Sequence, residues 1–203
     1  MAKEKPERYG EDPEYYSGFF GFTESFWTSR VPCCECGARV REWRKLQLLG
    51  RSYRLKVVRG AVASLRFDGR NFLLSRRARS KATDHFRRWY VQTGRFWLRE
   101  RVSLLSRKVG VAAARVNIRD IGYRWGSCRK NGVIYFNWKL LQLPARVADY
   151  VIAHELAHLH ERHHGDEFWR ILDRSLPDWR DRSEELKVKA RDTYWCHDRM
   201  KNH

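Results

Sequence analysis

The sequence has little of what a membrane or secreted protein needs. No apolar run approaches the roughly 18 residues of a membrane-spanning helix. The first six residues show no apolar stretch behind their charges, so we expect neither a membrane segment nor a secretory signal peptide. Cysteines number five, an odd count, and three of them crowd together as Cys33, Cys34 and Cys36. This is not a disulfide framework, and it favours a protein of the reducing cytoplasm.

Acidic residues are also scarce: 24 Asp and Glu stand against 42 Lys and Arg, a net charge of +18. The excess falls in one segment, because residues 49–143 hold 23 basic and four acidic residues, and 18 of the 23 are Arg. Arg pairs its planar guanidinium with phosphate through two parallel hydrogen bonds. Segment 49–143 therefore predicts a surface for DNA or another polyanion. A solvated basic exterior and a surface for acidic proteins are the other interpretations.

Wholesale disorder is excluded by the aromatic content, which is 14% and includes nine Trp. A chain of 203 residues suits one domain of ordinary size, and it is long enough to bury a sizeable core. We expect an N-terminal extension over residues 1–48, partly flexible and containing the cysteine cluster. A single domain follows over residues 49–196, and residues 197–203 form a short tail.

Hydrophobic periodicity predicts an α+β fold. Apolar residues alternate between residues 53 and 74 and predict a small antiparallel meander. Apolar residues at helical spacing between residues 86 and 104 predict a long helix, which ends at Gly110. An Asn-Gly pair at residues 131–132 marks a second hairpin. Pro144 suits the first turn of a further helix, where its missing N–H costs nothing.

The helix after Pro144 carries the chemistry, because residues 154–158 read His-Glu-Leu-Ala-His. His154 and His158 lie about 40° apart on one helix face, so both imidazoles can bind a single zinc ion. Glu155 lies about 60° round from His158, close enough to reach a water at the metal without being a ligand. The spacing therefore predicts a zinc hydrolase site with Glu155 as its base.

A catalytic zinc site usually has a third protein ligand and one open position. His160 would face away from the metal, about 200° round the helix from His158. His164 follows six residues after His158, and Gly165 beside it allows a sharp turn back towards the metal. We predict His164 as the third ligand. The alternatives that stay open are His163 and, if a later helix supplies a carboxylate, Glu184 or Glu185.

Four blocks of the sequence occur in order at compatible spacing: Arg124–Cys128, Gly132–Leu140, Tyr150–His158 and His164–Trp169. Together they resemble the YgjP-like metallopeptidase family, a zincin type related to the WLM and SprT-like groups. The resemblance covers about residues 50–195. It implies a zinc peptidase that acts on protein or peptide substrates, with the ion on His154, His158 and His164 and with Glu155 as general base.

The same resemblance implies a zincin-like α+β fold, in which a small antiparallel sheet packs on a long helix and is followed by the HExxH helix and C-terminal helices. An edge strand should lie beside the metal helix, and we expect residues 133–137 to present that edge to an extended peptide. Glu161 stands where metzincins have a turn glycine, so the bend towards His164 is expected near residues 163–165. Candidate stabilisers of the oxyanion are Tyr123, Arg124 and Tyr135.

The competing hypothesis is a nucleic-acid-binding protein with a structural zinc site and no protease activity. A structural site would need a fourth protein ligand in place of the open position. Glu155 favours the enzyme, because a structural site has no use for a base. A minor alternative places a structural zinc ion on the cysteines, although their spacing is not the usual CxxC. That site would combine Cys33, Cys34 and Cys36 with Cys128 or Cys196.

Overall fold

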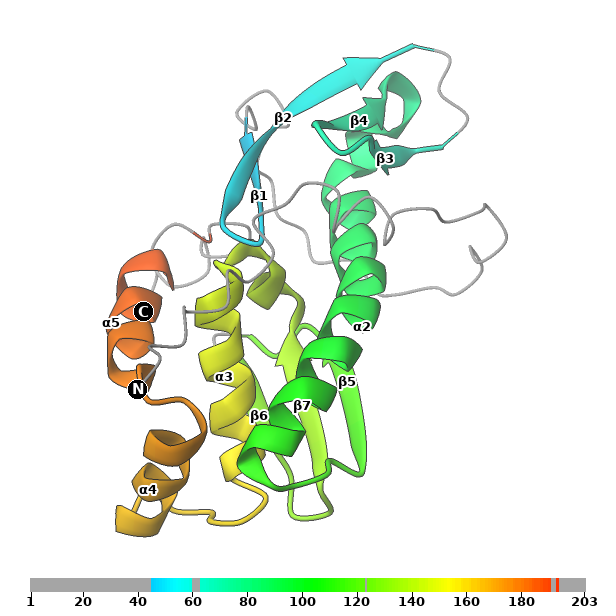
Figure 1. Cartoon of the computed structure of the whole chain (residues 1–203). Helices are drawn as coiled ribbons and strands as arrows, with labels where there is room; N and C mark the ends of the chain where they lie inside the picture. The colour runs from blue at the N-terminus through cyan, green and yellow to red at the C-terminus, as the bar shows by residue number, and fades with distance from the viewer. Residues whose placement is uncertain (1–44, 60–62, 123, 191–192, 194–203) are drawn as a thin grey trace, which may run out of the picture.

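The computed structural model describes residues 45–59, 63–122, 124–190 and 193. They form two small β-sheets and four α-helices, which makes the fold α+β (Figure 1). Among the described helices, none combines the length and the apolar character that a membrane span requires. The long helix α2 runs along the molecule and connects the two sheets (Figure 1).

The first sheet contains β1 (Lys45–Leu48), β2 (Arg51–Val58), β3 (Leu65–Phe67) and β4 (Asn71–Ser75), in the order β1-β2-β4-β3. The hairpin between β3 and β4 is antiparallel, as is the pair β1–β2. The predicted meander is nevertheless wrong, because β2 pairs with β4 in parallel. Alternation of apolar residues sets which face of a strand is buried, but it does not choose the partner strand. Strand β1 lies before residue 49, where the domain was predicted to begin.

A short 3-10 helix, η2 (Arg76–Lys81), leads into α2 (Ala82–Val109). As predicted, α2 ends at Gly110, which takes the left-handed conformation with φ 80°. Gly94 lies in the middle of α2, where a Cβ would stand 2.4 Å from Cδ1 of Ile118 and 2.9 Å from Cδ1 of Leu141. The glycine therefore lets the helix approach the second sheet closely.

The second sheet contains β5 (Arg115–Arg119), β6 (Gly126–Cys128) and β7 (Val133–Asn137), in the order β5-β7-β6. The hairpin β6–β7 confirms the turn predicted at residues 131–132. Because β7 pairs with β5 in parallel on its other side, β7 is the central strand and not the predicted edge. The edge strand beside the metal helix is β6. Both sheets thus contain parallel and antiparallel pairs, and the prediction of a wholly antiparallel sheet is wrong.

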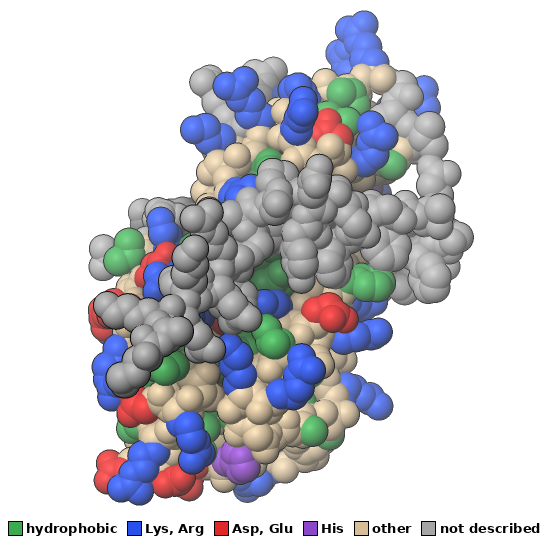
Figure 2. Space-filling model, in the orientation of Figure 1, with side chains coloured by type: hydrophobic (Ala, Val, Ile, Leu, Met, Phe, Trp, Pro, Cys, Tyr) green, Lys and Arg blue, Asp and Glu red, His purple; other side chains and the backbone are tan. Residues whose placement is uncertain are grey.

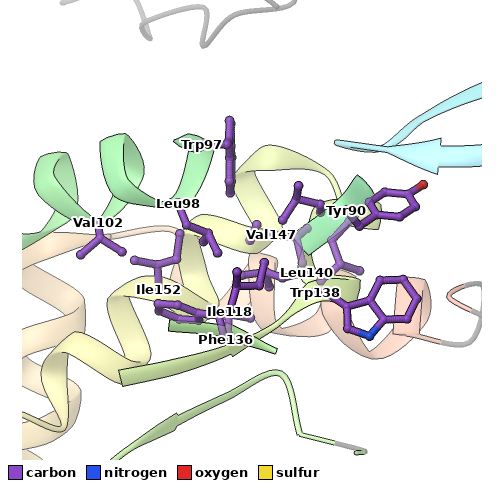
Figure 3. Close-up of a cluster of buried hydrophobic side chains, with 14 of the residues drawn as sticks. Tyr90, Trp97, Leu98, Val102, Ile118, Phe136, Trp138, Leu140, Val147 and Ile152 are labelled. Atoms are coloured by element: carbon purple, nitrogen blue, oxygen red, sulfur yellow. The ribbon is translucent and has the colours of Figure 1, made fainter. Parts of the chain in front are cut away.

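The remaining elements are η3 (Trp138–Gln142), α3 (Ala145–Ala157), α4 (Asp166–Ser175) and α5 (Trp179–Lys189). Helix α3 begins directly after Pro144, as predicted, and is buried on nearly all sides. Its apolar side chains meet those of α2 and β7 in one core (Figure 3). Fully or almost fully buried members of this core include Leu98, Ile118, Phe136, Leu140, Val147 and Ile152.

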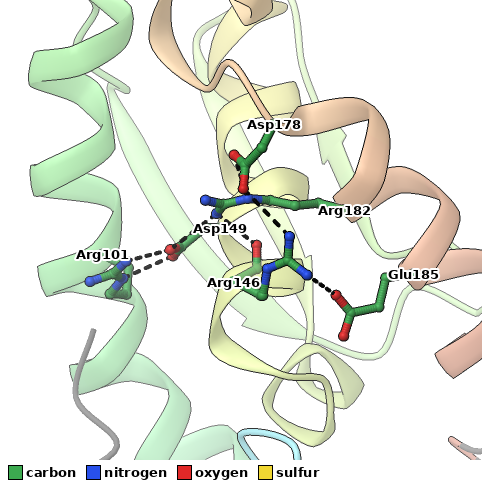
Figure 4. Close-up of polar contacts among 6 residues, drawn as sticks. All are labelled: Arg101, Arg146, Asp149, Asp178, Arg182 and Glu185. Atoms are coloured by element: carbon green, nitrogen blue, oxygen red, sulfur yellow. Dashed lines mark hydrogen bonds and ion pairs between the residues drawn. The ribbon is translucent and has the colours of Figure 1, made fainter. Parts of the chain in front are cut away.

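A buried carboxylate connects α3 with the helices on either side (Figure 4). Asp149 on α3 is 4% exposed and accepts two hydrogen bonds from Arg101 on α2. Arg182 on α5 lies 3.8 Å from the same carboxylate and also donates to the backbone carbonyl of Arg146. Burial strengthens such charge-assisted bonds and makes the loss of one partner costly. The network therefore fixes α2 and α5 against the helix that carries the HExxH motif.

Candidate metal centre

The two motif histidines stand at the C-terminal end of α3, His154 in its last turn and His158 as its C-cap residue. The chain turns directly after Ala157, over residues 158–160, and bends again at residues 162–163 and at Gly165. The return therefore starts earlier than predicted. Gly165 has an ordinary φ of −81°, so the turn does not depend on glycine's conformational freedom. This path brings His164 back to the end of α3.

The three histidines His154, His158 and His164 converge. One ring nitrogen of each lies within 4.8 Å of the others, and Nε2 of His154 is 3.0 Å from Nε2 of His164. His163 is not part of this group in the described chain. The two alternative carboxylates are paired elsewhere, Glu184 with Lys187 and Glu185 with Arg146.

The protonation of His154 and His158 suits a cation. Burial, with the neighbouring His158 and His164, lowers the pKa of His154 to about 3. Burial also lowers the pKa of His158. Nδ1 of His158 lies 3.1 Å from the carbonyl oxygen of Glu161, a contact that places the proton on Nδ1 and leaves Nε2 as a lone-pair donor. Neutral imidazoles with converging lone pairs are what a zinc ion needs, so the residues present fit the metal.

An aromatic layer from α4 holds the imidazoles in place. The buried ring of Phe168 contacts all three, with centroid distances of 4.9 Å to His154, 4.6 Å to His158 and 4.7 Å to His164. Trp169 stacks on His164 and donates its indole N–H to the carbonyl of that residue at 3.0 Å. Phe168 is fully buried, and its close fit restricts the rotation of the rings.

Glu155 points to the other side of the histidines, towards the edge strand β6. Its carboxylate accepts a hydrogen bond from the backbone N–H of Cys128. A Cβ on Gly126 would stand 2.4 Å from Cγ and 2.5 Å from Oε1 of Glu155. Burial raises the pKa of Glu155 to about 7, although the Cys128 N–H and the positive charge of Arg124 act against the rise. The carboxylate therefore sits in a slot that the strand backbone shapes.

The sequence reasoning missed the part that Gly126 and the Cys128 backbone play. A glycine inside a strand that precedes a hairpin was the available signal, since such a glycine often marks a close approach to the backbone. The contact itself joins residues far apart in the chain, so no local pattern announces it.

The three predicted oxyanion candidates differ in position. Tyr123 lies outside the described residues. Arg124 is exposed and close enough to Glu155 for its charge to lower the pKa of that carboxyl. Tyr135 follows Ile134 and precedes Phe136, whose side chains are fully buried on the helix side of the sheet. Because side chains alternate along a strand, Tyr135 points to the opposite face, where Arg119 lies 4.1 Å from its ring centroid. The structure does not bring Tyr135 to the histidines.

Four of the five cysteines lie outside the described residues, so the suggested cysteine site falls there too. Cys128 is described as a free thiol, half-buried on β6. Burial and the nearby Glu155 carboxylate raise the pKa of this thiol, which keeps it protonated and unreactive at neutral pH.

Comparison with known proteins identifies a matching family. A family model described as YgjP-like, metallopeptidase domain, matches residues 36–189. Among solved structures, the crystal structure of the metallopeptidase zymogen of Pyrococcus abyssi abylysin is similar, with a TM-score of 0.42 and 23% sequence identity. That match covers 45% of this chain and 92% of the abylysin chain. No curated protein matches the chain.

Proposed function

Because the chain belongs to the YgjP-like metallopeptidase family, we propose that it hydrolyses peptide bonds with a zinc ion held by His154, His158 and His164. The observation that carries this proposal is the convergence of three imidazole nitrogens within 4.8 Å of one another. Three neutral imidazoles are the ligand set of a catalytic zinc site, and they leave one position for water or substrate. This proposal also implies that the fold is of the zincin type.

When bound, zinc supplies Lewis-acid chemistry, which activates water at neutral pH and polarises a carbonyl group. The protein residues supply the rest. Glu155 accepts the proton of the attacking water and passes it to the leaving amine. The Cys128 N–H holds this carboxylate in one orientation, and Gly126 leaves room for it, so the base is aimed before the substrate arrives.

The edge of β6 that does not pair with β7 is the proposed binding site for an extended peptide. The backbone carbonyl of Trp125 accepts from the Asn137 N–H, and the Arg129 N–H donates to the carbonyl of Val133, at 2.9 Å each. In an antiparallel pair the intervening groups alternate in direction, so the backbone of Gly126 and Cys128 points away from β7 and towards α3. A substrate strand that adds to this edge lies beside Glu155. Arg124, exposed next to the same edge, is the favoured candidate for stabilising the oxyanion.

Metal analysis combined with a casein or peptide cleavage assay tests the proposal. We expect about one zinc ion per chain and hydrolysis that a chelator abolishes. His158→Ala should lose zinc, whereas His160→Ala, which alters an exposed histidine outside the cluster, should keep both zinc and activity. His164→Ala and His163→Ala make a second matched pair, of which the His164 variant should lose zinc. Loss of zinc in the His163 variant instead would identify His163 as the third ligand.

Glu155→Gln separates the base from the metal. The variant should retain zinc and fold normally but lose hydrolysis by at least about 100-fold, because general base catalysis contributes at that level. Turnover at the wild-type rate in this variant would remove Glu155 from the mechanism.

The competing function is a nucleic-acid-binding protein with a structural zinc ion and no protease activity. In the described part of the chain, the histidine group has three members, one fewer than a closed structural site needs. Its third member, His164, is also exposed to solvent. Both observations favour the peptidase. Zinc that resists chelators, together with no hydrolysis of any peptide, would favour the structural alternative.

A further inference from the structure

A strongly basic surface lies at the end of the molecule opposite the histidines. In the described residues 45–59 and 63–81, which form the first sheet and η2, ten Lys and Arg side chains are exposed against one acidic side chain, Asp68. Figure 2 shows these charges around the upper end of the molecule and histidine at the lower end. Helix α2, with 28 residues, extends between the two ends over about 42 Å. The basic surface is thus separate from the metal centre.

The regularly spaced charges of this surface lie on the outer face of the first sheet. Its inner face packs Phe72 and Phe67 against α2 through Trp89. On the outer face, register places Lys45 directly opposite Arg54, and it places Lys56 and Arg66 on either side of Leu73. Like charges in directly opposite positions destabilise a sheet. Solubility alone does not require these opposed cations, whereas a bound anion would turn their mutual repulsion into a shared attraction.

Two further observations strengthen the positive potential. Helix η2 adds four exposed cations, Arg76, Arg77, Arg79 and Lys81, immediately before α2. They lie at the positive end of that helix dipole, where cations are unfavourable unless an anion is bound. Asp68 supplies one negative charge against the ten exposed cations, and its carboxylate accepts two backbone N–H bonds within its own turn.

The composition of the surface favours phosphate over other polyanions. Arg prevails among the exposed cations, and its fork matches phosphate oxygens in two parallel hydrogen bonds. A membrane-binding face needs apolar anchors, and an interface with an acidic protein needs an apolar centre. Among the described residues of this sheet, Val57 is the one large hydrophobic side chain that is clearly exposed. Strand β2, at about 3.3 Å per residue, is long enough to follow about eight base pairs.

We propose that the outer face of the first sheet, together with η2, binds the phosphate backbone of nucleic acid. This inference goes beyond the proposed function, and it does not depend on the peptidase activity. It narrows the binding region predicted from segment 49–143 to one surface, which is remote from the metal centre. The arrangement would hold the peptidase near nucleic acid while leaving the edge of β6 free for a protein substrate.

Binding of a labelled 30-bp DNA duplex across salt concentrations tests the placement. The triple variant Arg54→Gln, Lys56→Gln, Arg66→Gln removes three charges from the outer face. If each contacts a phosphate, the slope of log Kd against log salt falls by about 2.7, and Kd at 0.15 M salt rises about 100-fold. The matched control Arg95→Gln, Arg99→Gln, Lys189→Gln removes three exposed charges elsewhere and should change Kd less than about threefold.

Equal weakening in the two triple variants, or no binding of wild-type protein to the duplex at 0.05 M salt, would overturn the proposal. A single-stranded 30-mer distinguishes the form of nucleic acid, since its slope should be smaller. Polyglutamate of equal charge and phosphatidylserine vesicles should compete poorly, and equal competition by either would assign the surface to an acidic protein or a membrane. The measurements use the Glu155→Gln protein as well. Binding by that variant shows that the surface stands even if the peptidase proposal fails.

Discussion

Replacing Gly126 with alanine should lower kcat about 100-fold while zinc content is unchanged. The new methyl group would stand 2.4 Å from Cγ, 2.5 Å from Oε1 and 2.7 Å from Cδ of Glu155. Carbon atoms in contact prefer about 3.5–4.0 Å, so either the carboxylate or strand β6 must move by about 1 Å. A displacement of this size in a reacting group costs about 100-fold in rate. The same overpacking should lower stability by about 1–3 kcal/mol.

Steady-state kinetics, metal analysis and thermal unfolding together separate these effects. Gly94→Ala is the matched control, because its Cβ would also stand 2.4 Å from a side-chain atom, but in the core beside Ile118 rather than at the site. It should lose stability to a similar extent and keep most of its kcat. In a Glu155→Gln background, Gly126→Ala should have little further effect on the residual rate, because the glycine acts through that carboxylate. A folded, zinc-loaded Gly126→Ala enzyme with kcat within threefold of wild type would refute the reasoning.

Three further predictions concern the stability of the fold and of the metal centre. Asp149→Ala leaves Arg101 buried without its partner and should lower the free energy of unfolding, measured in urea, by about 3–5 kcal/mol. The control Arg146→Ala breaks exposed pairs and should lower it by less than about 1 kcal/mol. Equal losses in the two variants would contradict the role of the buried network. Phe168→Ala should lower the free energy of unfolding by about 3–5 kcal/mol and weaken zinc binding in a chelator competition. The control is Phe96→Ala, at a position that is 44% exposed. Unchanged zinc affinity in the Phe168 variant would exclude its role in holding the imidazole rings. Burial and Arg88 lower the pKa of His85 in the folded protein, so the unfolded chain binds its proton first and the stability this residue contributes is lost as the pH falls below about 6.5. The melting-temperature difference between wild type and His85→Gln should therefore change between pH 7.5 and 5.5, and a constant difference would contradict the shift.

Local sequence patterns predicted the elements that depend on residues close together in the chain. The α3 helix and its start after Pro144 were predicted correctly, because helix geometry is local and a proline fits only its first turn. The same geometry placed His154 and His158 on one face, and the structure has their rings 4.9 Å apart. The end of α2 at Gly110 and the hairpin before β7 follow from turn chemistry, which is equally local.

Spacing alone favoured His164 but left His163, Glu184 and Glu185 open, because a loop of several residues can return in many ways. The tertiary structure distinguished them: the packing of Phe168 from α4 fixes where the chain returns, and ion pairs hold both glutamates elsewhere. The role of residues in binding zinc stays a prediction, whereas their convergence is a feature of the fold.

What the sequence determined by itself was the set of chemical groups and the helix that presents two of them, since both depend on identity and on a period of 3.6 residues. What only the tertiary structure decided was which strand partners which, and which strand is left at the edge. Strand β7 had the stronger apolar pattern and was expected at the edge, but it pairs with β5 on one side and β6 on the other, which makes it central and leaves the short β6 at the edge. Contacts between distant segments, such as Gly126 with Glu155, arise only when burial of the whole core selects one pairing.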